Sequence, residues 1–201
     1  MFTVFTTIVQ GLYTVFTTIA QGFYKALAKS SLVPVRARIF AIDRIDMDSN
    51  NELFTRLTRD PSVPSPLRVH SCCYVTKASP ALAMLVMDHR APDVVRAQAV
   101  LTLDYDLPTY KRLVLDPNLP DTVRETAVYE LVDDVQFLEG VARDSSYPLA
   151  VRVAAIITLP QDSRVIQDMA SGHDVPITLQ SWAKWNVSGL DHPDHDLDDC
   201  G

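Results

Sequence analysis

Five prolines in this chain are spaced 28 residues apart: Pro64, Pro92, Pro120, Pro148 and Pro176. An arginine follows each of the first four by four residues, and an aspartate precedes each of them by four residues. Seven residues after each proline stands a small residue, namely Ser71, Ala99, Ala127, Ala155 and Ala183. A period of about 20–50 residues is the signature of a repeat protein, so this spacing constrains the fold more than any other feature.

An earlier copy of the repeat precedes these five. Pro34, Arg38 and Ala41 match the pattern with a spacing of 30 residues, and the excess falls in the polar stretch 48–51. An insertion is tolerated best in such a surface loop. Six copies therefore begin near residues 30, 60, 88, 116, 144 and 172, and the last is truncated after its first helix.

Each copy has the chemistry of a helix pair. Proline fits the first turn of a helix, and an aspartate before it favours the positive helix N-terminus. Apolar residues follow at helical spacing, and a second, shorter helix is predicted at 80–87, 108–115, 133–143 and 163–170. One pair cannot bury its own apolar faces, but stacked copies form a continuous core. We therefore predict an all-α fold, an α-solenoid of six two-helix repeats over residues 30–187.

The recurring charged residues are predicted to be structural. A residue that recurs in every copy belongs to the repeat itself, through capping or bonds between neighbouring loops, whereas a catalytic residue is needed only once. This predicted structural ladder comprises Asp88, Arg96, Asp116, Arg124, Asp144 and Arg152.

The stretches 116–127 and 148–155 resemble the Asp-Pro…Val-Arg…Ala pattern of the HEAT-like repeats found in bilin-lyase-type and related prokaryotic repeat proteins. The resemblance covers residues 30–187, with about two extra residues between the leading aspartate and the arginine. It implies an α-solenoid. It does not imply one activity, since such arrays serve as scaffolds, adaptors, lyases and regulators.

Residues 1–29 contain a different repeat and are predicted to form a separate N-terminal helix. Residues 3–13 are followed by a near-identical copy at 14–24, and no charged residue occurs before Lys25. Eleven residues make about three helical turns, so both copies present one continuous apolar face. The predicted anchoring residues on this face are Phe5, Ile8, Leu12, Phe16, Ile19 and Phe23.

Three roles for this helix remain open. It packs against partner proteins or copies of itself, it enters a membrane, or it packs on its own repeats. Residues 2–24 exceed the roughly 20 residues needed to span a bilayer, and the following basic cluster suits a cytoplasmic repeat region. Against this, eight threonine and glutamine side chains are many for a lipid-facing helix.

No candidate for chemistry is convincing. The net charge of −7 argues against nucleic-acid binding, and no cofactor site is predicted. Cys72 falls at a core position beside His70, so a catalytic pair is not expected. The acidic tail, 188–201, contains His192 and His195 without the spacing of a closed metal site. Trp182 and Trp185 occur only in the last copy and predict either capping of the stack or an aromatic docking site.

The sequence thus predicts a non-enzymatic protein–protein interaction scaffold. It would be a structural or adaptor subunit of a large multi-protein assembly such as a virus particle, anchored through its N-terminal helix. The expected partners are other protein subunits, including further copies of the chain, and the expected location is the cytoplasm or the assembly. The alternative is a membrane-anchored HEAT-like adaptor with residues 2–24 in the bilayer. A HEAT-like enzyme or nucleic-acid-processing protein ranks third.

Overall fold

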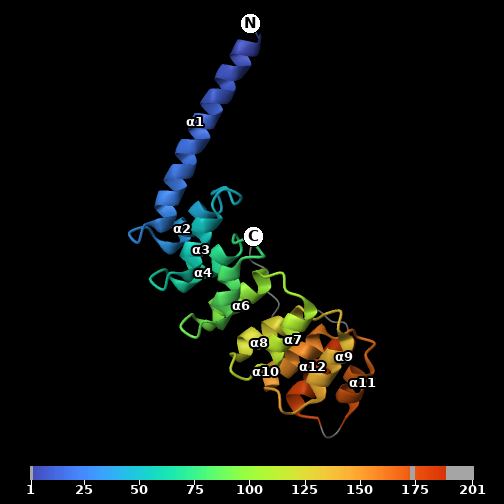
Figure 1. Ribbon diagram of the computed structural model, residues 1–201. Helices are drawn as coiled ribbons and strands as arrows, with labels where there is room; N and C mark the ends of the chain where they lie inside the picture. Colours follow the sequence, from blue (N-terminus) through green and yellow to red (C-terminus); the bar gives the residue numbers. More distant parts are fainter. Residues whose placement is uncertain (1, 173–174, 189–201) are drawn as a thin grey trace. The chain divides into compact units, whose positions relative to one another are not determined.

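The computed structural model describes residues 2–172 and 175–188, with side chains from Thr14 onward, and these residues form twelve helices and no strand (Figure 1). The predicted all-α class is therefore confirmed. The helices are α1 (Phe2–Lys29), α2 (Val35–Ile42), α3 (Asn51–Arg59), α4 (Ser65–Cys72), α5 (Pro80–Met87), α6 (Asp93–Thr102), α7 (Leu107–Leu115), α8 (Asp121–Tyr129), α9 (Val135–Arg143), α10 (Leu149–Thr158), α11 (Arg164–Ser171) and α12 (Ile177–Ser188).

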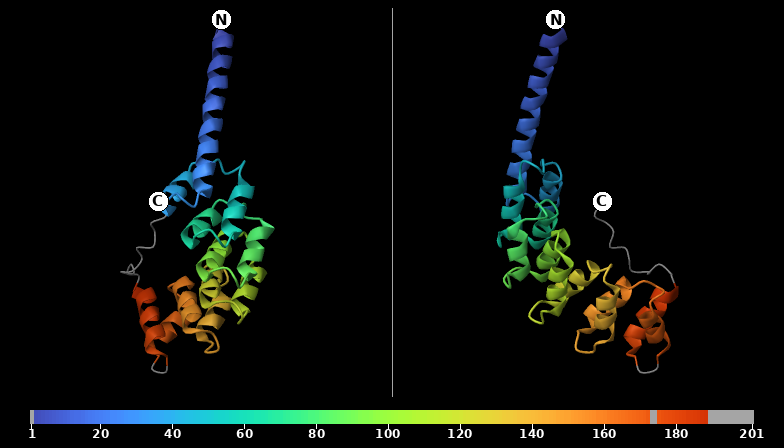
Figure 2. Two further views of the ribbon diagram at one scale, coloured as in Figure 1. Left: turned by 90° about the vertical axis from the view of Figure 1, so that its left-hand side faces the viewer. Right: turned by 45° about the vertical axis from the view of Figure 1, so that its right-hand side comes forward.

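The chain divides into two compact units, Met1–Leu103 and Asp104–Gly201. In the first unit α1 packs on α2, α3 on α4 and α5 on α6, and α4 also packs on α2 and α6 (Figure 2). In the second unit α7 packs on α8, α9 on α10 and α11 on α12, and α10 also packs on α8 and α12. Six of these packed pairs therefore join the helix before a recurring proline to the helix after it.

The recurring prolines set where five of the helices begin. Pro34, Pro64, Pro92, Pro120 and Pro148 are the N-cap residues of α2, α4, α6, α8 and α10, each with φ between −53° and −56°. Each proline carbonyl accepts the amide of the arginine four residues later, at 3.1 Å in every case. Because the pyrrolidine ring already holds φ near this value, the chain enters each helix at little entropic cost.

The recurring aspartates lie elsewhere than expected. The prediction that they favour the following helix N-terminus is wrong, because each is the C-cap residue of the preceding helix. Their Oδ1 atoms accept the backbone amide two residues later, at 2.8–3.0 Å, in turns led by Asp60, Asp88, Asp116 and Asp144. This side chain closes its own turn, as aspartate commonly does.

The core is built from the same positions in every copy. The small residue seven places after each proline is fully buried in all six copies: Ala41, Ser71, Ala99, Ala127, Ala155 and Ala183. The residue after it is also fully buried in the first five copies, as Ile42, Cys72, Val100, Val128 and Ile156. The 28-residue period of the sequence therefore becomes a repeated packing contact.

The C-terminal turns of α1 belong to the first helix pair. Gln21 Oε1 accepts the amide of Asp46 at 2.9 Å, as Asn51 Oδ1 at the start of α3 accepts the amide of Thr76 at 2.9 Å. Gln21 and Asn51 are 30 residues apart, the same spacing as Pro34 and Pro64. Residues 21–29 thus occupy in the first pair the place that α3 occupies in the second. The rest of α1 extends away from α2–α6 (Figure 1).

Candidate functional site

In each of the first five helix pairs, an arginine joins the second helix to the end of the first. Arg38, Arg68, Arg96, Arg124 and Arg152 each donate Nε to the carbonyl ten residues earlier, at 2.8–3.0 Å. The acceptor is always the penultimate residue of the preceding helix: Ala28, Thr58, Val86, Val114 and Ala142. We call these five arginines the arginine ladder.

The arginine ladder satisfies carbonyls that a helix end leaves without partners. The last four carbonyls of a helix lack intrahelical donors, and a positive charge is favourable there. Arg38, Arg68, Arg96 and Arg124 are only 2–6% exposed, so they are part of the core rather than of a binding surface. Two acidic residues of the first helical turn approach this row, with Arg96 Nη1 lying 3.6 Å from Asp93 Oδ1 and Arg124 Nη1 3.8 Å from Asp121 Oδ1.

The last copy replaces both members of the pattern. Gln180 donates Nε2 to the carbonyl of Gly172 at 2.9 Å, so glutamine also bonds the end of the preceding helix, but at its C-cap residue, eight residues earlier rather than ten. A Cβ atom at Gly172 would lie 3.0 Å from the carbonyl oxygen of Asp168. The aspartate found here in four earlier copies would therefore be crowded.

The predicted anchoring residues of α1 divide into two groups. The side chains of Phe5, Ile8 and Leu12 lie outside the described residues. Phe16, Ile19 and Phe23 are 69%, 64% and 60% exposed, and Val15 beside them is 55% exposed. We call Val15, Phe16, Ile19 and Phe23 the α1 stripe. This stripe is not buried against the chain's described helices.

The other side of α1 is fixed to the first unit. Gln21 donates Nε2 to the carbonyl of Arg44 at 2.8 Å and accepts from the amide of Asp46 at 2.9 Å, so one side chain holds the loop after α2 at two points. Ala28, two turns later, is fully buried. These contacts hold α1 by one side and leave the α1 stripe facing away. The sequence signal for this joint was the match between Gln21 and Asn51, which the 11-residue duplication obscures.

Some hydroxyl groups on the polar face of α1 form hydrogen bonds with the backbone of the same helix. Thr17 Oγ1 and Thr18 Oγ1 both donate to the carbonyl of Thr14, at 2.9 and 2.8 Å. A hydroxyl that bonds its own helix exposes mainly its methyl group. The threonines therefore make this helix less polar than their number indicates.

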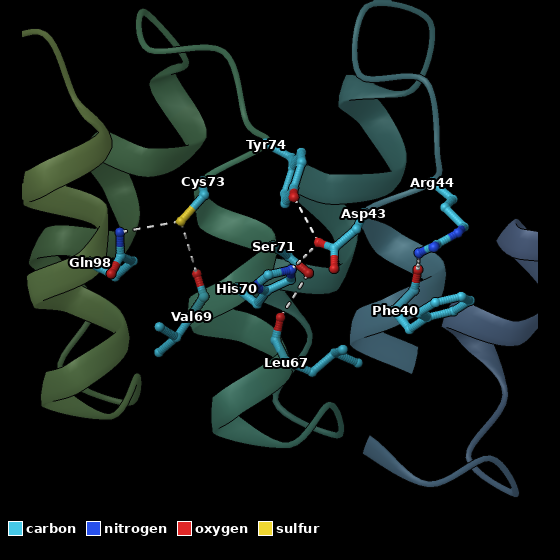
Figure 3. Close-up of polar contacts among 10 residues, drawn as sticks. All are labelled: Phe40, Asp43, Arg44, Leu67, Val69, His70, Ser71, Cys73, Tyr74 and Gln98. Atoms are coloured by element: carbon cyan, nitrogen blue, oxygen red, sulfur yellow. Dashed lines mark hydrogen bonds and ion pairs between the residues drawn. The ribbon is translucent and has the colours of Figure 1, made fainter. Parts of the chain in front are cut away.

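A polar cluster bridges the first two helix pairs (Figure 3). Asp43 Oδ1, just after α2, accepts from His70 Nε2 at 2.6 Å and from Tyr74 Oη at 2.7 Å. Burial opposes ionisation of Asp43, but the hydrogen bonds from Tyr74 and His70 outweigh it and lower its pKa. Burial and the bond to Asp43 raise the pKa of Tyr74 to about 12. The cluster joins one helix pair to the next.

This cluster lacks an activated nucleophile. Ser71 Oγ, on the neighbouring turn, donates to the carbonyl of Leu67 at 2.8 Å within the core. Burial raises the pKa of the Cys72 thiol to about 12, so the thiolate needed for attack is scarce at neutral pH. Cys73 is exposed and accepts from Gln98 Nε2 at 3.5 Å (Figure 3). The geometry supports a contact between copies rather than catalysis.

Trp182 and Trp185 lie together on α12. Their ring centroids are 5.5 Å apart and the ring planes cross at 85°, an edge-to-face pair, and both residues are half-buried. Asn186, on the same helix, donates Nδ2 to the carbonyls of Ile156 and Leu159 at the end of α10, at 2.6 and 3.2 Å. These bonds, together with the packing of α12 on α10, hold the last helix against the preceding copy.

Basic residues line a groove between α1 and α3. Lys25 and Lys29 face it from α1, and Ser49, Asn50 and Arg56 from the α3 side. Arg56 is already paired with Glu52 at 3.4 Å, and both side chains are well exposed. Asn50, a buried polar residue of the lining, already donates Nδ2 to the carbonyl of Asp46 at 2.6 Å, so the groove offers mainly surface charge.

The described residues contain neither a cluster of metal ligands nor a helix suited to cross a bilayer. Within residues 2–172 and 175–188, no group of three histidine, cysteine, aspartate or glutamate side chains is placed to hold a metal ion. His192 and His195 of the tail lie outside the described residues. Over the part of the chain that the structure describes, no helix combines the length and the apolarity that crossing a bilayer requires.

Comparison with known proteins finds no match for this chain. No protein-family model, no curated protein and no solved structure matches the chain. The resemblance to HEAT-like repeats therefore depends on the residue pattern quoted above.

Proposed function

We propose that this chain is a non-enzymatic interaction scaffold, a structural or adaptor subunit that joins a multi-protein assembly through α1. In this proposal the six copies form one α-solenoid, and the repeat core only holds the docking surfaces in place. The α1 stripe carries the proposal, because four large apolar side chains are 55–69% exposed on a helix whose opposite side is fixed.

The exposed area supports a protein-binding role. At roughly 180 Å² on average for a fully exposed large apolar side chain, the four residues of the α1 stripe present roughly 450 Å² of apolar surface. The largest apolar patch of a typical monomer is about 300–600 Å² and is often functional. At about 25 cal/mol per Å², covering the stripe is worth roughly 11 kcal/mol before the costs of association. A surface of this kind favours a permanent rather than a transient partner.

The remaining chemistry supports a scaffold over an enzyme. The arginine ladder is occupied with helix carbonyls, and Asp43 and His70 bond each other across two helix pairs. Cys72 is buried and its pKa is raised. None of these groups is offered to a substrate.

The test is migration of the tagged chain in its native source, in detergent-free density gradients. The stripe variant carries Phe16→Asp and Ile19→Asp, and the control carries Thr14→Asp, an exposed position on the far side of α1. We expect the unaltered chain and the control to migrate with other proteins in constant proportion, and the stripe variant to migrate as the free chain. A stripe variant that still joins the assembly contradicts the proposal. Recovery of the chain only with detergent favours the membrane alternative instead.

A further inference from the structure

The first helix pair has an open edge. In the second and third copies the sixth residue after the proline contacts the ninth residue after the proline of the copy before, since His70 bonds Asp43 and Gln98 bonds Cys73. In the first copy this sixth residue is Phe40, which is 50% exposed, with the Arg44 guanidinium over one face of its ring at 3.4 Å from the centroid. An apolar side chain thus occupies a position that the second and third copies use to contact a preceding pair.

The α1 stripe continues this edge. Phe23 matches Leu53 at the 30-residue spacing, and Leu53 lines a groove with Lys25 and Lys29 of the preceding helix. The matching position in the next copy therefore faces the pair before it, whereas none of the described helices covers Phe23 itself. Terminal repeats normally close a stack with a polar outer face. Here the edge is apolar, and Phe23 is 60% exposed.

Gly22 is a second, independent observation. Glycine is among the poorest residues for a helix interior, so its presence there calls for a steric reason. A Cβ atom built on Gly22 meets nothing within 4 Å, so no neighbour within the chain supplies that reason. Gly22 follows Ile19 by three residues and so lies beside it on the helix surface. The duplication repeats the glycine, as Gly11.

We propose that the α1 stripe binds the α1 helix of a second copy of this chain, in antiparallel orientation. This inference rests on the proposed function and names the first partner of the same surface. Two copies of the described stripe offer roughly 900 Å², close to the roughly 1,000 Å² of a specific interface, before residues 2–13 are counted. Both α1 helices carry the same 11-residue duplication, so their apolar residues recur with the same period. No charged side chain precedes Lys25, so side-chain charges do not drive the two helices apart there.

Charge selects the antiparallel orientation. A parallel pair would bring together the two basic segments, 25–44, each with five basic residues and one aspartate, and would align the two helix dipoles. An antiparallel pair centred on the junction of the two 11-residue copies, between residues 13 and 14, separates them. In that register residue 19 of one chain lies opposite residue 8 of the other, and residue 22 opposite residue 5. The N-terminal turns of each α1 then reach the open edge beside Phe23 of the other chain.

Sedimentation equilibrium of the purified full-length chain without detergent tests the pairing. We expect a dimer that Thr14→Asp preserves and that Ile19→Asp weakens at least about 100-fold, because a carboxylate is buried there without a partner. Gly22→Ala should weaken the dimer at least about tenfold while leaving the melting temperature of the monomer unchanged or higher. An unaltered chain that is monomeric overturns the inference, as does a dimer indifferent to both substitutions.

Disulfide cross-linking tests the orientation, in a background with Cys73→Ser and Cys200→Ser, where the remaining Cys72 is buried. Chains with Ile8→Cys mixed with chains carrying Ile19→Cys should cross-link, whereas chains with Ile19→Cys alone should not. Self-cross-linking of the latter overturns the antiparallel arrangement. If the purified chain is monomeric but the stripe variant leaves its native assembly, the pairing is wrong and the proposed function stands. If the dimer forms but no other protein migrates with it, the pairing stands and the adaptor function is wrong.

Discussion

Replacement of Arg96 by alanine should destabilise the first unit more than any exposed charge substitution. Arg96 is 2% exposed, and its Nε donates to the carbonyl of Val86 at 2.8 Å, in the last turn of α5. The second contact is weaker, because Nη1 lies 3.6 Å from Asp93 Oδ1 and the Asp93 side chain is 55% exposed. The first contact joins α5 to α6, so its loss acts on a whole helix pair.

The magnitude follows from these two contacts. Losing a hydrogen bond from a charged donor to a buried carbonyl costs about 1.5–3 kcal/mol. The ion pair with Asp93 adds little, since exposed pairs contribute about 0–1 kcal/mol. Truncating the buried stem of the arginine removes further packing. We therefore expect Arg96→Ala to lower the free energy of unfolding by about 2–4 kcal/mol, and Asp93→Ala by less than about 1 kcal/mol.

Urea unfolding followed by circular dichroism measures both values, with Arg90→Ala as the control because Arg90 is exposed in the adjoining turn. A surface substitution of this kind should stay within about 0.5 kcal/mol of the unaltered chain. If Arg96→Ala matches Arg90→Ala, the carbonyl contact does not stabilise the pair. If Asp93→Ala costs as much as Arg96→Ala, the ion pair rather than the carbonyl is the main interaction, and the argument from helix capping is wrong.

Three further predictions concern the first unit. Because hydrogen bonds lower the pKa of Asp43, its contribution to the stability of the fold should be complete above about pH 5 and be lost as the pH falls below about 4. In thermal melts, the melting temperature of Asp43→Ala should therefore depend less on acid pH than that of the unaltered chain, and an equal dependence contradicts this. In a Cys200→Ser chain, a thiol reagent should label exposed Cys73 quickly and buried Cys72 only on unfolding, whereas equal rates refute the burial argument. Gln21→Ala should destabilise the unit by about 1–2 kcal/mol in urea unfolding, for two lost bonds to backbone groups, and no change would show that α1 is not fixed there.

The repeat pattern predicted the helices well because it reflects packing. A small residue at a fixed place in every copy indicates close helix contact, and all six such residues are buried. The second helix predicted at 80–87 is α5, Pro80–Met87, and the others differ by one or two residues at their ends. Periodicity was sufficient here because each copy repeats the same local chemistry.

The partners of the recurring charges could not be read in the same way. Spacing alone shows that Asp88 and Arg96 recur together, and it favours a helix N-terminus for the aspartate. The backbone turn decides otherwise, since Asp88 Oδ1 accepts the amide of Arg90, and Arg96 reaches back to Val86. Such partners depend on where the chain reverses. A backbone carbonyl can accept a hydrogen bond whatever its side chain is, so the sequence does not show which residue is the acceptor.

The composite nature of α1 was hidden by two overlapping periods. Residues 14–24 belong to the 11-residue duplication, while residues 21–29 match α3 at the 30-residue spacing. The duplication is the stronger pattern, so residues 1–29 were predicted as one separate helix. Gln21 belongs to both periods, and it is the residue whose side chain holds α1 to the loop after α2.

The first and last copies depart from the repeat pattern, and these departures are the places best suited to a specific function. Interior copies repeat one chemistry, since the arginine ladder and the Asp turns stabilise each pair in the same way. The first copy departs by exposing Phe40 and by merging with α1, and the last departs by using Gly172, Gln180 and a tryptophan pair. A change in an interior copy alters stability, because it removes a contact within a core. A change at an exposed residue of the apolar edge, such as Ile19 or Phe40, leaves that core intact and alters only what the edge can contact, so binding and stability should be separable by substitution in this chain.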